Sequence, residues 1–219
     1  MSRSDRILNV GLLVAVIGVV LLLADRLFDL TNSRGEQQGQ RFVTEASWRE
    51  LGKEGHRLGM RGGPIQLVVF TDFQCPYCKA LSPMLGELLA RYPQELTVVV
   101  RHFPLDALHP LAREAAEAAV CADRAGRFLE FHDSVFRGQG GIGSRSWTTF
   151  AVEAGVSDVA EFERCVSDRD GRAVIDRDLI AGTKLRLRGT PLILVNETRI
   201  DGLVEMIVLD SLVRAKLDR

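Results

Sequence analysis

The spacing of apolar residues predicts a strand, a helix and a second strand near the middle of the chain. Residues 65–71 (IQLVVFT) and 96–101 (LTVVVR) are short apolar runs rich in branched side chains, which are typical of buried strands. Between them, four leucines recur at helical spacing, so residues 75–92 are expected to form a helix with one apolar face. Pro76 suits the first turn of that helix, where its missing N–H would have no intrahelical partner anyway.

A long helical region is expected to follow the second strand. Residues 107–187 carry a succession of helical patterns and are too long to be a single crossover helix. Residues 189–196 (GTPLILVN) then read as a turn into an apolar strand, residues 197–202 (ETRIDG) as a hairpin turn with a short edge strand, and residues 204–217 as a final helix. This order predicts an α/β fold with an inserted α-helical subdomain.

The amino-terminal part carries a different pattern. Residues 7–24 (ILNVGLLVAVIGVVLLLA) contain no charged residue and reach the length of a candidate transmembrane helix. Two arginines precede this run, as in an export signal, but no small-residue cleavage pattern ends it, so an uncleaved signal anchor over residues 1–24 is favoured over a cleaved signal peptide. Residues 25–41 are expected to be a flexible tether, and residues 42–219 a folded domain that opens with a short helix and a glycine-rich loop.

Composition and charge narrow the class of protein. The chain has 219 residues, of which 46% are hydrophobic and 26% charged, as in a globular protein with a sizeable core. Its formal net charge of −1 provides no basic field, so nucleic acid is not expected as a partner. Four cysteines are too few for a disulfide-rich scaffold, and their positions are therefore more informative than their number.

Two of the cysteines, Cys75 and Cys78, stand two residues apart where the predicted strand turns into the predicted helix (FQCPYCK). If the helix begins here, the Cys75 sulfur faces unpaired backbone N–H groups and the positive end of the helix dipole, which favour the thiolate. Cysteines in such motifs can have pKa values of about 3.5 to 7.5, against about 8.5 for a free cysteine. The pair predicts an attacking Cys75 and a resolving Cys78, with Pro76 and Tyr77 tuning the redox potential.

A metal half-site and a purely structural bridge are the two other interpretations of this pair. A zinc site needs a second pair of ligands, and none follows at a suitable spacing. A bridge between Cys75 and Cys78 would close a very small loop and would stabilise the fold little. A redox dithiol is favoured, because C-x-x-C at a strand–helix junction is typical of redox motifs, and no metal or organic cofactor is implied. His102 and Phe103 are expected to line the groove beside it.

Four segments of the chain together resemble the DsbA-like thioredoxin-fold proteins. These segments are FTDFQCPYC, RHFPL, AAEAAVCADRAGRFLEFHDSVF and GTPLILVN, and the resemblance covers roughly residues 65–217. It implies a thioredoxin-like fold with an inserted helical subdomain, in agreement with the order of elements above. It also implies that Pro191 is a cis-proline opposite the dithiol, that the backbone of Thr190 pairs with a bound peptide, and that the chemistry is extracytoplasmic thiol–disulfide exchange.

One position departs from the family pattern. Members often carry a buried acid six residues before the first cysteine, thought to assist proton transfer at the resolving thiol, and this chain has Val69 there. Neither Asp72 nor Glu87 is an evident substitute. The departure bears on how quickly Cys78 loses its proton, and does not bear on whether the motif is redox active.

The remaining cysteines, Cys121 and Cys165, lie on predicted helices of the inserted region. They are either two small buried apolar residues or the two halves of a bridge between helices. Relatives with a similar arrangement can carry such a bridge, and export would permit it. The resemblance therefore implies a structural disulfide between Cys121 and Cys165.

Together, these features predict a membrane-anchored protein-disulfide oxidoreductase whose catalytic domain faces the periplasm or the outside of the cell. Its expected partners are cysteine-containing exported proteins and a membrane or soluble redox partner that resets the dithiol. A disulfide-forming oxidase is the first choice, and a pathway-specific reductase or isomerase is the enzymatic alternative. A membrane-tethered peptide-binding or chaperone module with a vestigial dithiol, and a structural metal module, are the non-enzymatic alternatives.

Overall fold

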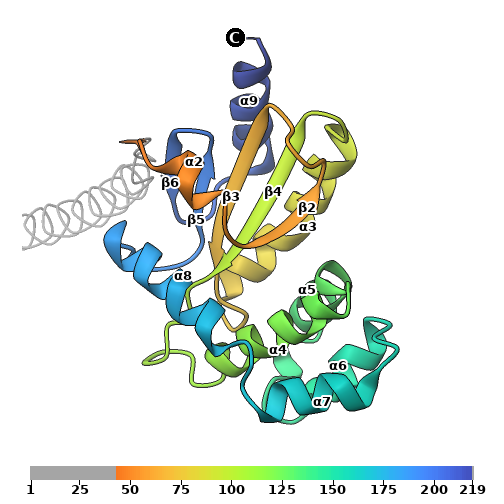
Figure 1. Ribbon diagram of the computed structural model, residues 1–219. Coiled ribbons are helices and arrows are strands. Elements are labelled where there is room, and N and C mark those ends of the chain that lie inside the picture. Colours follow the sequence, from red (N-terminus) through yellow and green to blue (C-terminus); the bar gives the residue numbers. More distant parts are fainter. Residues whose placement is uncertain (1–42, 219) are drawn as a thin grey trace, which may run out of the picture. The chain divides into compact units, whose positions relative to one another are not determined.

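A computed structural model describes residues 43–218, which are built on a six-stranded sheet (Figure 1). The spatial order of the strands is β1-β6-β5-β3-β4-β2. The strands are β1 (Val43–Thr44), β2 (His56–Gly59), β3 (Ile65–Thr71), β4 (Leu96–His102), β5 (Leu192–Val195) and β6 (Thr198–Asp201). The predicted anchor (residues 1–24) and tether (residues 25–41) lie outside the described residues. Within residues 43–218, no helix combines the length and the apolar character needed to cross a bilayer.

Strand β3 is the centre of the sheet, pairing in parallel with β4 and antiparallel with β5. Val69 on β3 stands opposite Val100 on β4 and Ile193 on β5. The two strands predicted from the apolar runs are confirmed, as is the hairpin formed by β5 and β6. Because β5 runs antiparallel to β3, the first residues of β5 lie beside the last residues of β3. These two strand ends therefore meet at the same end of the sheet.

The strand β2 was not predicted. The sequence pattern gives only a short helix and a loop for residues 42–63, and the helix is present as α2 (Trp48–Leu51). The residues HRLG of β2 nevertheless pair antiparallel with β4, and His56 and Leu58 face the interior. A histidine at an inward position is not typical of a buried strand, so the local sequence does not predict this pairing.

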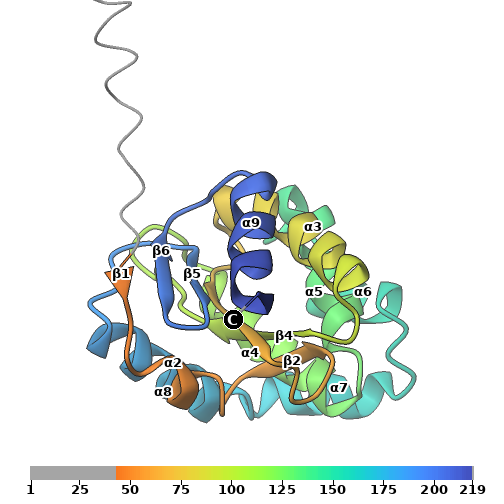
Figure 2. The same ribbon diagram turned by 90° about the horizontal axis from the view of Figure 1, so that it is seen from above.

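Helices cover both faces of the sheet. They are α2, α3 (Pro76–Arg91), α4 (Ala112–Arg124), α5 (Phe128–Arg137), α6 (Trp147–Glu153), α7 (Val159–Ser167), α8 (Arg172–Lys184) and α9 (Met206–Leu217). Figure 2 shows α3 and α9 on one side of the sheet and α2 and α8 on the other. The predicted helix at residues 75–92 is confirmed as α3, and the final predicted helix as α9.

Alternate residues of the central strands pack into two separate apolar layers. On β3, Leu67 and Val69 face the layer that includes leucines of α3 and α9. The intervening Val68 and Phe70 face the layer formed with α2 and α8, to which Leu185 also contributes. Burial on both faces explains why the strand reads as a continuous apolar run instead of an alternating one.

The helical insertion stands between β4 and β5, as predicted. Helices α4 to α7 form a group that lies below the sheet in the view of Figure 1. The last helix of the expected region 107–187 differs, because α8 packs on the sheet itself. Asp178 of α8 accepts a hydrogen bond of 2.7 Å from Arg101 Nε and another of 2.8 Å from the His102 N–H, and all three residues are buried.

A disulfide bond joins Cys121 of α4 to Cys165 of α7, with Cα atoms 5.8 Å apart. Both residues are almost fully buried, at 2% and 3% exposure. The bond therefore links two helices of the insertion to each other. Its place in the fold is that of a structural crosslink within the insertion.

Candidate active site

The strand-to-helix turn that carries the first cysteine is shaped by Asp72. The Asp72 carboxylate accepts a hydrogen bond from the Gln74 N–H at 2.7 Å, and the Asp72 carbonyl accepts one from the Cys75 N–H at 3.1 Å. Cys75 has extended backbone dihedrals and is the N-cap of α3, and Pro76 is the first helical residue. The Cys75 sulfur is thereby placed at the amino end of α3, as the sequence predicts.

The same carboxylate ties this turn to the segment that follows β4. Its second oxygen accepts hydrogen bonds from the Leu105 N–H and from His109 Nδ1, both at 2.8 Å. The Asp72 side chain is fully buried, and the His109 side chain is 20% exposed. Sequence reasoning considered Asp72 only as a substitute for a missing acid and found no role for it, whereas the structure shows that it holds the turn in place.

A glutamine of the insertion also holds the turn. Gln139 Nε2 donates to the carbonyl oxygens of Phe73 and Cys75, at 2.9 and 3.0 Å. Gln139 lies in the short 3-10 turn that follows α5, more than sixty residues from its two partners. The sequence offers no local signal for this contact, because it depends on how the insertion docks on the sheet.

The two sulfurs are reduced and buried, and their pKa values move in opposite directions. A hydrogen bond with the Cys78 thiol lowers the pKa of Cys75 to about 5, against the opposing effect of burial. Thr190 and the backbone N–H groups of Cys78 and Tyr77 lower it further. The backbone N–H groups at the amino end of α3 contribute as expected, but the neighbouring thiol lowers the pKa of Cys75 more than they do.

Cys78 has the environment of a thiol that keeps its proton. Burial raises the pKa of Cys78 well above its ordinary value, and the nearby Cys75 raises it further, while a hydrogen bond with the Thr71 side chain acts in the opposite direction. Thr71 is 3% exposed and is the last residue of β3. Val69, two residues earlier, is 1% exposed and faces the same apolar layer as Cys78. Thr71, with a smaller effect from the Thr190 side chain, is therefore a polar group that favours the Cys78 thiolate, and the sequence did not indicate this role of Thr71.

The segment that enters β5 lies against the first cysteine. The peptide bond between Thr190 and Pro191 is cis, and the Cys75 Sγ atom lies 3.3 Å from the Thr190 carbonyl oxygen. Thr190 is 7% exposed, and its N–H has no hydrogen-bond acceptor within residues 43–218. The structure thus brings together Cys75, Cys78, Thr190 and Pro191, which the sequence analysis selected.

Beside Cys75 there is a surface groove of about 780 Å³ that includes Thr190 and the ring of Tyr77. Tyr77 is 61% exposed, so its ring is available to a bound molecule. His102 and Phe103 do not line this groove, contrary to expectation. His102 is fully buried between the sheet and the insertion, and Phe103 packs in the layer with Leu185.

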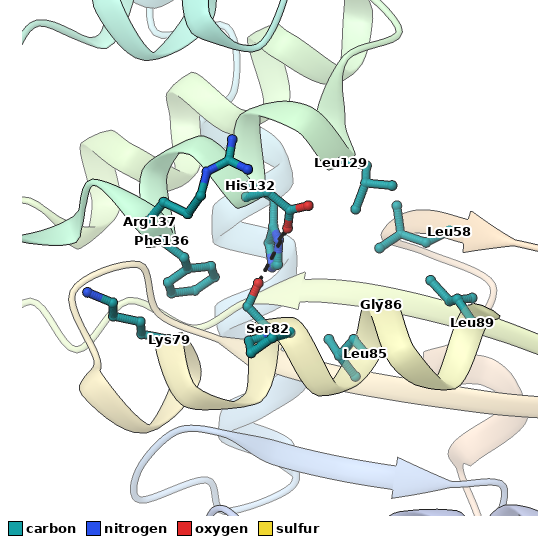
Figure 3. A pocket seen from close by; sticks show the side chains of 12 residues that line it. Leu58, Lys79, Ser82, Leu85, Gly86, Leu89, Leu129, His132, Phe136 and Arg137 are labelled. Atoms are coloured by element: carbon teal, nitrogen blue, oxygen red, sulfur yellow. Dashed lines mark hydrogen bonds and ion pairs between the residues drawn. The ribbon is translucent and has the colours of Figure 1, made fainter. Parts of the chain in front are cut away.

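A second cavity of about 450 Å³ lies farther along α3, facing α5 (Figure 3). Lys79 and Arg137 stand at one end of it and several leucines at the other, with a Ser82–Asp133 hydrogen bond of 3.4 Å between them. Neither active-site cysteine lines this cavity. In the described part of the chain, no group of three His, Cys, Asp or Glu residues is arranged to hold a metal ion.

The fold and the site define a thioredoxin-fold dithiol protein. Its two cysteines lie at the amino end of a helix beside a cis-proline, and a helical insertion follows. A sequence profile described as thioredoxin matches residues 52–215, which is most of the chain, so the chain belongs to the thioredoxin family. The expected resemblance to DsbA-like thioredoxin-fold proteins is confirmed at the level of family and fold.

Solved structures support the fold. The thiol-disulfide exchange protein alpha-DsbA2 from Wolbachia pipientis aligns over 78% of this chain and 92% of its own, with a TM-score of 0.70 and 18% identity. Oxidised BdbD from Bacillus subtilis aligns over 82% of this chain and 99% of its own, with a TM-score of 0.70 and 16% identity. At these identities, the likeness shows a common fold.

Curated relatives match by sequence over only part of their length. The chain is 32% identical over 200 residues to the Na(+)/H(+) antiporter NhaA 3 of Salinispora tropica, covering 89% of this chain but 30% of that protein. The chain therefore spans about a third of the length of the curated relatives it matches, and ion transport is not carried over to it.

Proposed function

We propose that this protein is an extracytoplasmic protein-disulfide oxidoreductase that works mainly as a disulfide-forming oxidase. The observation that carries this proposal is the opposite tuning of two sulfurs one helical turn apart. The pKa of Cys75 is lowered to about 5, so Cys75 is a thiolate at neutral pH, whereas the pKa of Cys78 is raised. A stabilised thiolate favours the reduced protein, which makes its disulfide a stronger oxidant.

The proposed reaction transfers two electrons from the client to the protein. A client thiolate attacks Cys75 Sγ in the Cys75–Cys78 disulfide, a client–Cys75 bond forms, and the electron pair of the broken bond goes to Cys78 Sγ, which takes up a proton. A second client thiolate then attacks the client sulfur of the mixed disulfide. The client disulfide forms, and Cys75 leaves as a thiolate, which its low pKa makes a good leaving group.

Client binding is proposed at the edge of the sheet beside Cys75. The Thr190 N–H has no acceptor among residues 43–218, and its carbonyl oxygen lies 3.3 Å from the Cys75 sulfur. An extended peptide pairing with this backbone would present its cysteine to Cys75. Pro76 and Tyr77 occupy the positions between the cysteines, where they would affect the potential and contact the client.

The location and partners belong to the same proposal. The apolar run at residues 7–24 would anchor the protein, with residues 25–41 as a tether and the catalytic domain in the periplasm or outside the cell. The Cys121–Cys165 disulfide is the kind of bond that persists in such oxidising compartments. Reoxidation would need a membrane or soluble disulfide donor, and the clients would be exported proteins with cysteines.

Oxidation of a reduced, unfolded model client tests the proposal. The oxidised protein is expected to form client disulfides stoichiometrically, and Cys75→Ser is expected to abolish this transfer. The redox potential decides the direction of disulfide exchange. A value of about −120 mV supports an oxidase, and a value of about −270 mV supports a reductase. Peptide binding without any disulfide transfer by the parent protein would refute the proposal and indicate a binding module.

A further inference from the structure

The groove beside Cys75 carries an excess of positive charge. Three arginines line it, Arg186, Arg188 and Arg199, together with a single acidic residue, Asp201. Arg199 Nη2 donates to Asp201 at 2.8 Å, and Arg199 Nη1 donates to the Leu185 carbonyl at 2.8 Å, so this arginine is already satisfied. The charge that remains in the groove is that of the other two arginines.

Arg186 and Arg188 are exposed and have no carboxylate partner among residues 43–218. Many other arginines of this domain do have one, such as Arg113 with Asp106 and Asp176. The whole chain has a formal net charge of −1. The positive groove is therefore a local feature and does not follow from a basic composition.

The chain segment that carries the two arginines leads directly to Thr190, the residue beside the reacting sulfur. The Arg186 N–H donates to the Thr183 carbonyl at 2.9 Å, and the Leu187 N–H donates to the Gly182 carbonyl at 3.0 Å, which fixes the chain at the end of α8. Arg188 is two residues before Thr190, whose carbonyl oxygen lies 3.3 Å from Cys75 Sγ. The short segment from α8 to the cis-proline thus carries both arginines in the lining of the groove that also includes Thr190.

We infer that this groove selects client segments that carry acidic residues beside the reacting cysteine. This inference rests on the proposed function, because it names the clients of the same site. A carboxylate next to a cysteine disfavours its thiolate and slows its attack. Guanidinium groups in the groove attract such a segment and offset that repulsion, so they favour both binding and formation of the client thiolate. The exposed Tyr77 ring supplies an apolar contact on the same surface.

The test compares two dithiol peptides that differ only in flanking residues, one with glutamates and one with lysines. The readout is the ratio of their oxidation rates by each form of the protein, which removes any general loss of activity in a variant. The two peptides are also oxidised by a small uncharged disulfide, which gives their intrinsic rate ratio. With the wild-type protein, the ratio of the acidic to the basic peptide is expected to exceed this intrinsic ratio. Arg186→Glu with Arg188→Glu is expected to lower the ratio by about tenfold or more at low salt, because two charges are reversed.

A matched control carries the same change of net charge away from the groove. Arg49 and Arg61 are exposed and have no carboxylate partner among residues 43–218, so Arg49→Glu with Arg61→Glu is expected to leave the ratio within about twofold of the wild type. Added salt should reduce the wild-type preference.

An equal preference for both peptides in the wild-type protein, or the same loss in the control variant, overturns the inference while leaving the proposed function intact. A wild-type protein that oxidises neither peptide refutes the proposed function itself. Reduced glutathione, a small anionic thiol, serves as a third probe. If the arginine variant oxidises glutathione more slowly than the wild type does, while the wild type shows no preference between the peptides, the inference is also overturned.

Discussion

The Sγ atom of Cys75 lies 3.3 Å from the carbonyl oxygen of Thr190, a residue 115 positions later in the chain. Between them, the chain forms helix α3, strand β4 and the whole helical insertion. They meet because β5 runs antiparallel beside β3, with Leu192 opposite Phe70. The chemistry of Cys75 therefore depends on two segments that only the sheet brings together.

The first prediction concerns the ionisation of Cys75. Its alkylation rate should be half-maximal near pH 5, because its pKa is lowered to about 5. Cys78→Ala should raise this midpoint, since it removes the hydrogen bond of the Cys78 thiol, the largest cause of the lowered pKa. Thr190→Val should also raise it, because the Thr190 side chain is one of the groups that lower this pKa. Mass spectrometry of the alkylated protein gives the rates, and a wild-type midpoint near 9.0 would contradict the prediction.

The same ionisation should make the stability of the reduced protein depend on pH. The folded-state pKa of about 5 lies below the ordinary value of 9.0, so the unfolded state binds more protons between these limits. The reduced protein should therefore gain stability relative to the oxidised protein as pH rises from about 5 towards 9, and lose that gain as pH falls through about 5. Chemical denaturation of both forms at several pH values measures the difference, and the unfolding free energy of the reduced Cys75→Ser variant should lack this pH dependence.

The second prediction concerns Thr71 as the residue that supports Cys78. Loss of its hydroxyl in Thr71→Val should slow the release of a preformed Cys75 mixed disulfide by Cys78 by about threefold to tenfold, the effect of one hydrogen bond. Thr71→Ser keeps the hydroxyl and should react at nearly the wild-type rate. Quenched-flow separation of the mixed disulfide measures this step. Equal rates for the valine and serine variants would show that Thr71 has no part in it.

Much of the fold could be read from local pattern. The apolar run of β3 and the leucine spacing of α3 are properties of consecutive residues, and Pro76 marks where the helix begins. The cysteine spacing at that junction predicted which sulfur would be activated. These features depend on a few neighbouring residues, which is why the sequence was sufficient for them.

The supporting contacts of the site could not be read in this way. Gln139 reaches the Phe73 and Cys75 carbonyls only because the insertion docks there, and Thr71 faces Cys78 only because α3 folds back on β3. His102 was expected to line the groove, but it is fully buried and packs against Phe128 of the insertion. Such contacts depend on tertiary packing between segments far apart in the sequence.

The third prediction concerns the disulfide of the insertion. Cys121 and Cys165 are separated by 44 residues, and a crosslink of this span can contribute up to about 4 kcal/mol by restricting the unfolded chain. Cys121→Ala with Cys165→Ala should therefore lower the free energy of unfolding by about 2–4 kcal/mol. Neither residue lines the groove beside Cys75, so disulfide transfer should persist under conditions in which the variant is folded.

Denaturant titration of both proteins, each with its Cys75–Cys78 pair oxidised, measures this difference. Thiol counting supplies an independent check: the wild-type domain should show two thiols after mild reduction, from Cys75 and Cys78, and four after complete reduction in denaturant. Four accessible thiols after mild reduction, together with an unchanged unfolding free energy, would argue against a structural role for the bond.

The last prediction concerns the buried His102 and the stability of the domain in acid. His102 is fully buried, its two ring nitrogens have no partner among the described residues, and burial lowers its pKa well below 6.5. The titratable and charged groups around it are Arg101, His56, His132 and Asp178, whose carboxylate accepts a hydrogen bond from the His102 backbone N–H. The positive charge of Arg101 also disfavours a proton on the ring.

Because the unfolded histidine takes up a proton near pH 6.5 and the folded one does not, the free energy of unfolding should fall as pH decreases below about 6.5. One such group contributes a slope of at most about 1.4 kcal/mol per pH unit. His102→Leu should remove this contribution and flatten the dependence, whatever its effect on absolute stability. Denaturation of the oxidised proteins excludes the titration of Cys75, and an unchanged slope in the variant would show that His102 is not the group responsible.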